Sequence, residues 1–84
     1  MAMTEEMTWS YRNDNGRIVV VVLEPHGQEI DVPPGSQIVM KERGGVQPPS
    51  GGPRFEASRE GQRITVWAQW PGGVVRVYLD GQEV

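Results

Sequence analysis

The residues best suited to binding chemistry are two aromatic and two cationic side chains, Arg54, Trp67, Arg76 and Tyr78. Alternation with aliphatic residues places Trp67 and Tyr78 on the outer side of their strands. A guanidinium group can stack on an indole ring, and Trp, Tyr and Arg are enriched at the hot spots of protein interfaces. We therefore predict a contact patch on one sheet face, with Trp67 between Arg54 and Arg76. The alternative is that these side chains pack against one another across neighbouring strands and have no binding role.

The sequence offers little for catalysis or metal binding. A catalytic nucleophile needs an adjacent base, and the chain has no cysteine and a single histidine, His26. His26 stands between proline and glycine, a setting typical of a turn. Glu24, Glu29 and Asp31 are close to it in sequence, but alternate strand positions point to opposite faces, so we interpret them as a solvated acidic rim. We expect a non-enzymatic protein with no metal site and no cofactor.

Composition indicates a small all-β protein. The chain has 84 residues, including eleven glycines and seven prolines, and shows hardly any helical periodicity. Its formal net charge of −3 counts against a general nucleic-acid binder. Its longest apolar run, residues 18–23, is too short to span a membrane, and no signal-peptide pattern is present, which favours a cytoplasmic location. We expect a flexible tail over residues 1–7 and a single β domain over residues 8–84.

The clearest strand signals lie in residues 63–70 and 74–80, which we expect to form a hairpin around Pro71-Gly72. A two-residue loop would pair Val66 with Val77 and Ile64 with Leu79, while a four-residue loop would keep the same faces in another register. The inward residues of these two strands would be Ile64, Val66, Ala68, Val75, Val77 and Leu79.

The preceding strand, residues 53–59, alternates Phe55 and Ala57 inward with polar residues outward. A turn at Glu60-Gly61 would pair this strand with residues 63–70. The expected register sets Ala57 opposite Ile64 and Phe55 opposite Val66, which brings Arg54 beside Trp67.

The N-terminal half predicts a meander of three strands. Asn15-Gly16 is a strong hairpin signal and would join residues 8–13 to residues 17–24. A three-residue loop at Pro25-His26-Gly27 would align Val22 with Ile30 in the third strand. The predicted core of this half is Trp9, Tyr11, Ile18, Val20, Val22, Ile30 and Val32.

A fourth strand is expected over residues 36–42, with Ile38 and Met40 facing inward. Residues 43–53 hold four glycines and three prolines, so they predict a long irregular connection that either crosses between sheets or forms a mobile surface loop. The overall expectation is a six- to seven-stranded antiparallel β-sandwich, or a partly open barrel, built from two meanders.

Two classes of function fit this surface. The first is a protein-interaction module whose partner is another protein or a second copy of the chain. The second is a carbohydrate-binding module in which Trp67 and Tyr78 stack on sugar rings. The arginines beside the aromatic residues favour a protein partner, because sugar sites usually add Asn, Asp and Gln. Single-stranded nucleic acid on an open barrel is a weaker possibility, disfavoured by the acidic total.

Overall fold

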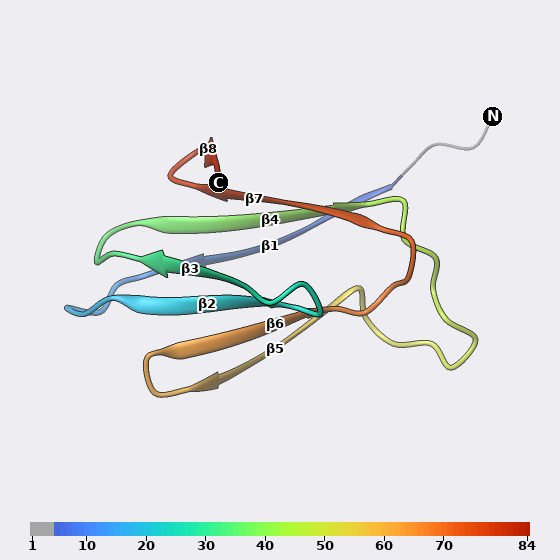
Figure 1. Ribbon diagram of the computed structural model, residues 1–84, viewed down its shortest axis with the longest axis horizontal. Helices are drawn as coiled ribbons and strands as arrows, with labels where there is room; N and C mark the ends of the chain where they lie inside the picture. The colour runs from blue at the N-terminus through green and yellow to red at the C-terminus, as the bar shows by residue number, and fades with distance from the viewer. Residues whose placement is uncertain (1–4) are drawn as a thin grey trace.

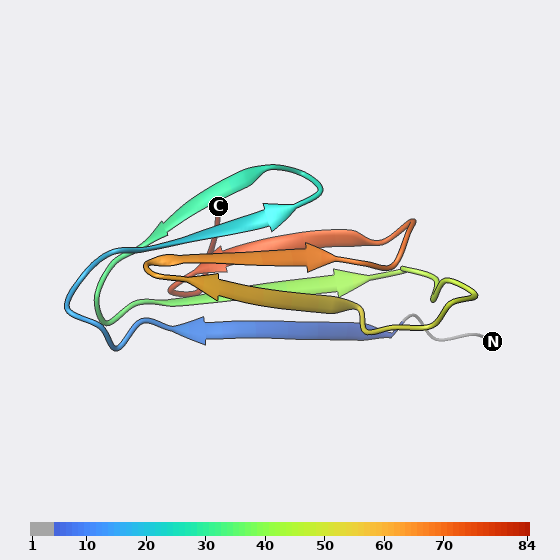
Figure 2. The same ribbon diagram turned by 90° about the horizontal axis from the view of Figure 1, so that it is seen from below.

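Eight β-strands make up the computed structural model of the protein, which describes residues 5–84 and contains no helix within that range. They form two four-stranded sheets, which lie one above the other in Figure 1 and overlap in the view of Figure 2. Sheet A has the order β1-β4-β7-β8, and sheet B has the order β3-β2-β6-β5. The expected all-β fold is confirmed. The strands are β1 (Glu6–Arg12), β2 (Val19–Glu24), β3 (Gln28–Val32), β4 (Gln37–Arg43), β5 (Phe55–Glu60), β6 (Arg63–Ala68), β7 (Val74–Leu79) and β8 (Gln82–Glu83).

Each sheet combines strands from both halves of the chain. In sheet A, β4 pairs with β7 in antiparallel fashion, and in sheet B, β2 pairs with β6 in parallel. The prediction of two sequential meanders in purely antiparallel sheets is therefore wrong, and the prediction of six or seven strands omits β8. Residues 44–54 cross from sheet A to sheet B. Of the two expected alternatives for the long connection, this is the crossing between sheets.

The first crossing replaces the hairpin expected at Asn15-Gly16, because β1 pairs with β4 and not with β2. Asn13 favours the change, since it is fully buried and hydrogen-bonded both to the segment before β4 and to the end of β3. Its backbone N–H donates to Ser36 O beside β4, and its Nδ2 donates to Val32 O at the end of β3. A polar side chain with these partners holds the chain where it leaves sheet A.

The last of the four crossings between the sheets separates β6 from β7, so the hairpin expected around Pro71-Gly72 is also wrong. The inward faces are nevertheless as expected: Ile64, Val66 and Val77 are buried in the common core. Alternation of apolar and polar residues specifies which side of a strand faces the interior. It does not distinguish a neighbour in the same sheet from a strand across the sandwich.

Registers differ from expectation in sheet B. β2 pairs with β3 as expected, but Ile30 lies opposite Val21 and not Val22, because the pairing of these strands ends at Leu23 and Gln28 and leaves four residues, 24–27, between that pair. A one-residue slip exchanges the two faces of a strand. Val19, Val21 and Leu23 therefore face the core, and Ile18 is 51% exposed. β5 and β6 also pair as expected, but two residues out of the expected register, with Ala57 opposite Val66.

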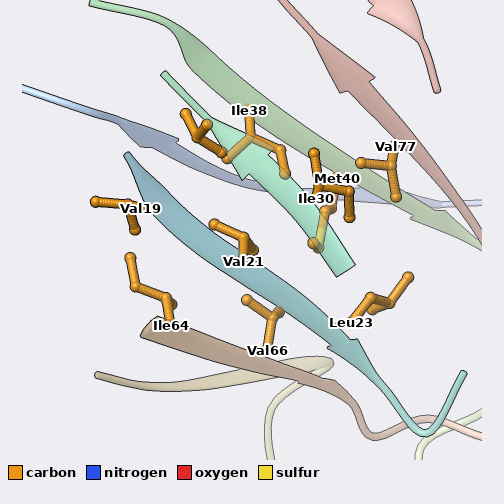
Figure 3. Close-up of a cluster of buried hydrophobic side chains, with 10 residues drawn as sticks. Val19, Val21, Leu23, Ile30, Ile38, Met40, Ile64, Val66 and Val77 are labelled. Atoms are coloured by element: carbon orange, nitrogen blue, oxygen red, sulfur yellow. The ribbon is translucent and has the colours of Figure 1, made fainter. Parts of the chain in front are cut away.

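The core lies between the sheets and draws on five strands (Figure 3). Trp9 and Tyr11 are partly buried against it, as are Phe55 and Leu79. β1 begins at Glu6, and residues 1–4 of the expected tail lie outside the described residues. Nothing in residues 5–84 forms a helix with the length and apolar character needed to cross a membrane. The core residues are Val19, Val21, Leu23, Ile30, Val32, Ile38, Met40, Ile64, Val66 and Val77.

Candidate functional site

The four residues predicted to form one patch lie in three places. Trp67 is on the outer face of sheet B, and Arg76 and Tyr78 share the outer face of sheet A. Arg54 is buried at one end of the sandwich, with 7% of its surface exposed. The predicted single patch is therefore wrong, because it required β6 and β7 to be neighbours in one sheet.

Arg54 takes part in a structural cluster. Its Nε lies 3.2 Å from Oε2 of Glu42, whose side chain is 1% exposed. These two atoms are close enough for an ion pair but are not aligned as a hydrogen bond. The guanidinium also stacks on Trp70, 4.3 Å from the ring centroid. The predicted cation–π chemistry thus occurs, with Trp70 in the place expected for Trp67.

A hollow of about 560 Å³ opens on the outer face of sheet A. Inward packing of Met40 and Val77 forces the alternate residues of β4 and β7 outward. We call the resulting surface the basic groove, defined by Lys41, Arg43, Val74, Arg76 and Tyr78. One acidic residue, Glu6 of β1, also lines the hollow.

The basic groove brings cations together although their mutual repulsion is unfavourable. Lys41 lies directly opposite Arg76 in the β4–β7 pair, and like charges in that arrangement are destabilising. The Nζ of Lys41 lies 5.3 Å from the ring centroid of Tyr78. Arg76 Nη1 lies 3.2 Å from Glu83 Oε2, but both side chains are at least half exposed, so this pair is weak and exchangeable. The cations remain accessible to an anionic ligand.

Sheet B has the opposite character on its outer face. Trp67, which is 46% exposed, lies between Glu24 on β2 and Glu56 on β5 in the strand registers. We call this surface the Trp67 face. Its outward ionisable residues are five acids and one base: Glu24, Glu29, Asp31, Glu56, Glu60 and Arg63.

A second hollow, of about 350 Å³, opens at the end of the sandwich beside Arg54. Its walls include Trp9, Phe55 and Trp70. Among residues 5–84, the only cation that lines it is Arg54, which is already paired with Glu42 and lies 3.5 Å from Glu5 Oε2. This hollow therefore offers aromatic surface but no cation free of a carboxylate partner among its described residues.

Two consequences follow for ligand binding. Trp67 and Tyr78 lie on the outer faces of different sheets, so one sugar chain cannot stack on both in the way the carbohydrate hypothesis required. Among residues 5–84, no three His, Cys, Asp or Glu side chains are grouped to hold a metal ion.

Sequence reasoning identified Arg76 and Tyr78 but missed Lys41, Arg43 and Val74. The alternation of β4 gave a signal for the first two, because an inward Met40 places residues 39, 41 and 43 on the opposite side of the strand. Their proximity to Arg76 depends on a pairing between distant strands, which local patterns do not encode.

Comparison with known proteins adds no identification. No family model matches the chain, and no significant match was found among curated proteins or among solved structures.

Proposed function

We propose that the chain is a non-enzymatic protein-interaction module that binds an acidic segment of a partner in the basic groove. The observation that carries this proposal is the gathering of Lys41, Arg43 and Arg76 around one hollow in a chain of net charge −3. A cluster of cations opposite in sign to the whole chain steers acidic partners toward that surface.

The apolar members of the basic groove favour a polypeptide ligand. Val74 is 61% exposed on its rim, and Tyr78 offers an aromatic ring beside Arg76. A segment with both carboxylates and an apolar side chain satisfies both kinds of residue. Its carboxylates would replace Glu6 and Glu83, which now lie 3.3 Å from Arg43 Nη2 and 3.2 Å from Arg76 Nη1.

A peptide-display selection against the immobilised protein tests the proposal. We expect acidic peptides with an apolar residue to be enriched and their binding to weaken as salt is raised. Arg76→Glu should weaken binding by about 30-fold, the effect of losing a hot-spot residue. Arg63→Glu is the matched control, because Arg63 is similarly exposed and ion-paired but lies on sheet B.

Three outcomes would overturn the proposal. The first is a selection with no acidic enrichment. The second is equal loss of binding with Arg76→Glu and Arg63→Glu. The third is preferential binding of a single-stranded oligonucleotide, included as a competitor because cations and aromatic rings also suit that ligand.

A further inference from the structure

We infer that one partner of the basic groove is the Trp67 face of a second copy of the chain. This inference rests on the proposed function, since it names an occupant for the same groove. The two surfaces lie on opposite outer faces of one molecule, so every copy carries both the groove and its complement.

Charge and shape match between the two surfaces. Trp67 projects from sheet B with a glutamate on the adjacent strand at either side, Glu24 and Glu56. The basic groove is a hollow with cations around exposed Val74. An indole ring in this hollow would cover Val74 and bring the flanking carboxylates to the cations. Trp and Arg are the residue types that most often dominate binding at protein interfaces.

The positions of the two surfaces along the sandwich also agree. Trp67 is the second-to-last residue of β6, and Val74 is the first residue of β7. Residues 69–73 alone connect these strands, so both surfaces lie at the end of the sandwich where β4 ends (Figure 1). Suppose that the outer face of sheet B in one copy packs on the outer face of sheet A in the next, with both copies pointing the same way along their length. Trp67 of the first copy then lies over the basic groove of the second.

Such a contact is heterologous, because two different surfaces meet. A heterologous contact does not close as a two-fold dimer, and it continues from copy to copy as a ring or a linear stack. Weight-average mass should therefore rise steadily with concentration and should fall as salt screens the charges.

Sedimentation velocity on two complementary variants tests this arrangement. Trp67→Ala removes the projecting ring but keeps the groove, and Arg76→Glu damages the groove but keeps the ring. We expect each variant alone to associate about 30-fold more weakly than wild type. An equimolar mixture should form a 1:1 heterodimer and no larger species, because it retains one intact contact.

Arg17→Glu is the control variant and should associate like wild type, because Arg17 is exposed in the connection between β1 and β2 and belongs to neither surface. Circular dichroism verifies that all variants are folded. A monomeric wild type at millimolar concentration would overturn the inference, as would a mixture that stays monomeric or a Trp67→Ala variant that associates as strongly as wild type. If the wild type is monomeric while acidic peptides bind in an Arg76-dependent way, the proposed function stands and only self-association fails.

Discussion

The inner face of β4 passes from an apolar middle to a charged end of the sandwich. Ile38 and Met40 are fully buried among aliphatic side chains, and Glu42, the next inward residue, is 1% exposed. Glu42 lies against Arg54, while its Oε1 accepts a hydrogen bond of 2.7 Å from the N–H of Gly45. One strand therefore buries similar volumes by two different means.

The two regions differ in how their stability is distributed. In the middle, each side chain contributes through the apolar area that it removes from water, and neighbours can partly relax around a loss. At the charged end, burial of Glu42 and Arg54 is costly unless both are present. The pair adds little net stability, but each member depends strongly on the other.

The largest effect is expected from Glu42→Ala, which leaves the buried guanidinium of Arg54 without its carboxylate. Loss of one member of a buried pair costs about 3–5 kcal/mol. Urea denaturation should show this fall in the free energy of unfolding. The double variant Glu42→Met/Arg54→Met should recover most of the loss, because it removes the charges together. If the double variant is no more stable than Glu42→Ala, the loss does not come from leaving Arg54 without its partner.

Met40→Ala tests the apolar middle of the strand, because it leaves a cavity there. Such truncations cost about 2–5 kcal/mol, depending on how far the site collapses. The same urea measurement applies. Here no second truncation should restore stability, so Met40→Ala/Val77→Ala should be less stable than either single variant. Recovery in that double variant would show that the middle also depends on paired residues.

Gly73→Ala is expected to have a smaller effect at the charged end. Gly73 does not have a positive φ, but an added methyl group would overlap the Glu42 carboxylate. Displacing that carboxylate from Arg54 should cost about 1–3 kcal/mol, the usual range for overpacking. Gly16→Ala is the control, since a methyl group there meets nothing within 4 Å. Equal stability of the two variants would show that Glu42 moves without cost.

The smallest effect concerns Asp80, an exposed carboxylate at the other end of β4. The backbone N–H of Gln37 donates to it at 2.9 Å and lowers its pKa, with a further hydrogen bond from Ser36. A lowered folded-state pKa gives stability that is present above the unfolded value, near 4, and is lost as pH falls through the folded value. Asp80→Asn should thus lower the thermal midpoint slightly at pH 7 and by less at pH 3. A constant difference would contradict this linkage.

The sequence predicted the fold class and most of the inward residues, because alternation reports the side of a strand directly. Ile38 and Met40 illustrate this success. The same reasoning failed for Glu42, since a glutamate in a strand is normally assigned to the surface. The cost of burying Glu42 is offset by Arg54, at the end of the long connection 44–54, and by the hydrogen bond from the N–H of Gly45.

Pairing of strands was harder to predict than their faces. Asn15-Gly16 and Pro71-Gly72 are both strong turn signals, yet each lies where the chain changes sheets. A turn sequence specifies that the chain reverses, and the hydrogen bonds of Asn13 to distant segments decide where it goes next. The basic groove went unpredicted for this reason.

The interleaving of the two halves has a consequence for how the protein is made. The inner strands β2 and β4 gain their second neighbours only when β6 and β7 have been synthesised. Pairings between segments so distant in sequence form slowly. The apolar side chains of the N-terminal half therefore stay exposed to solvent until the C-terminal half has been synthesised. By the same logic, a chain cut between residues 46 and 52 should yield two fragments that fold only together, a natural basis for a split reporter.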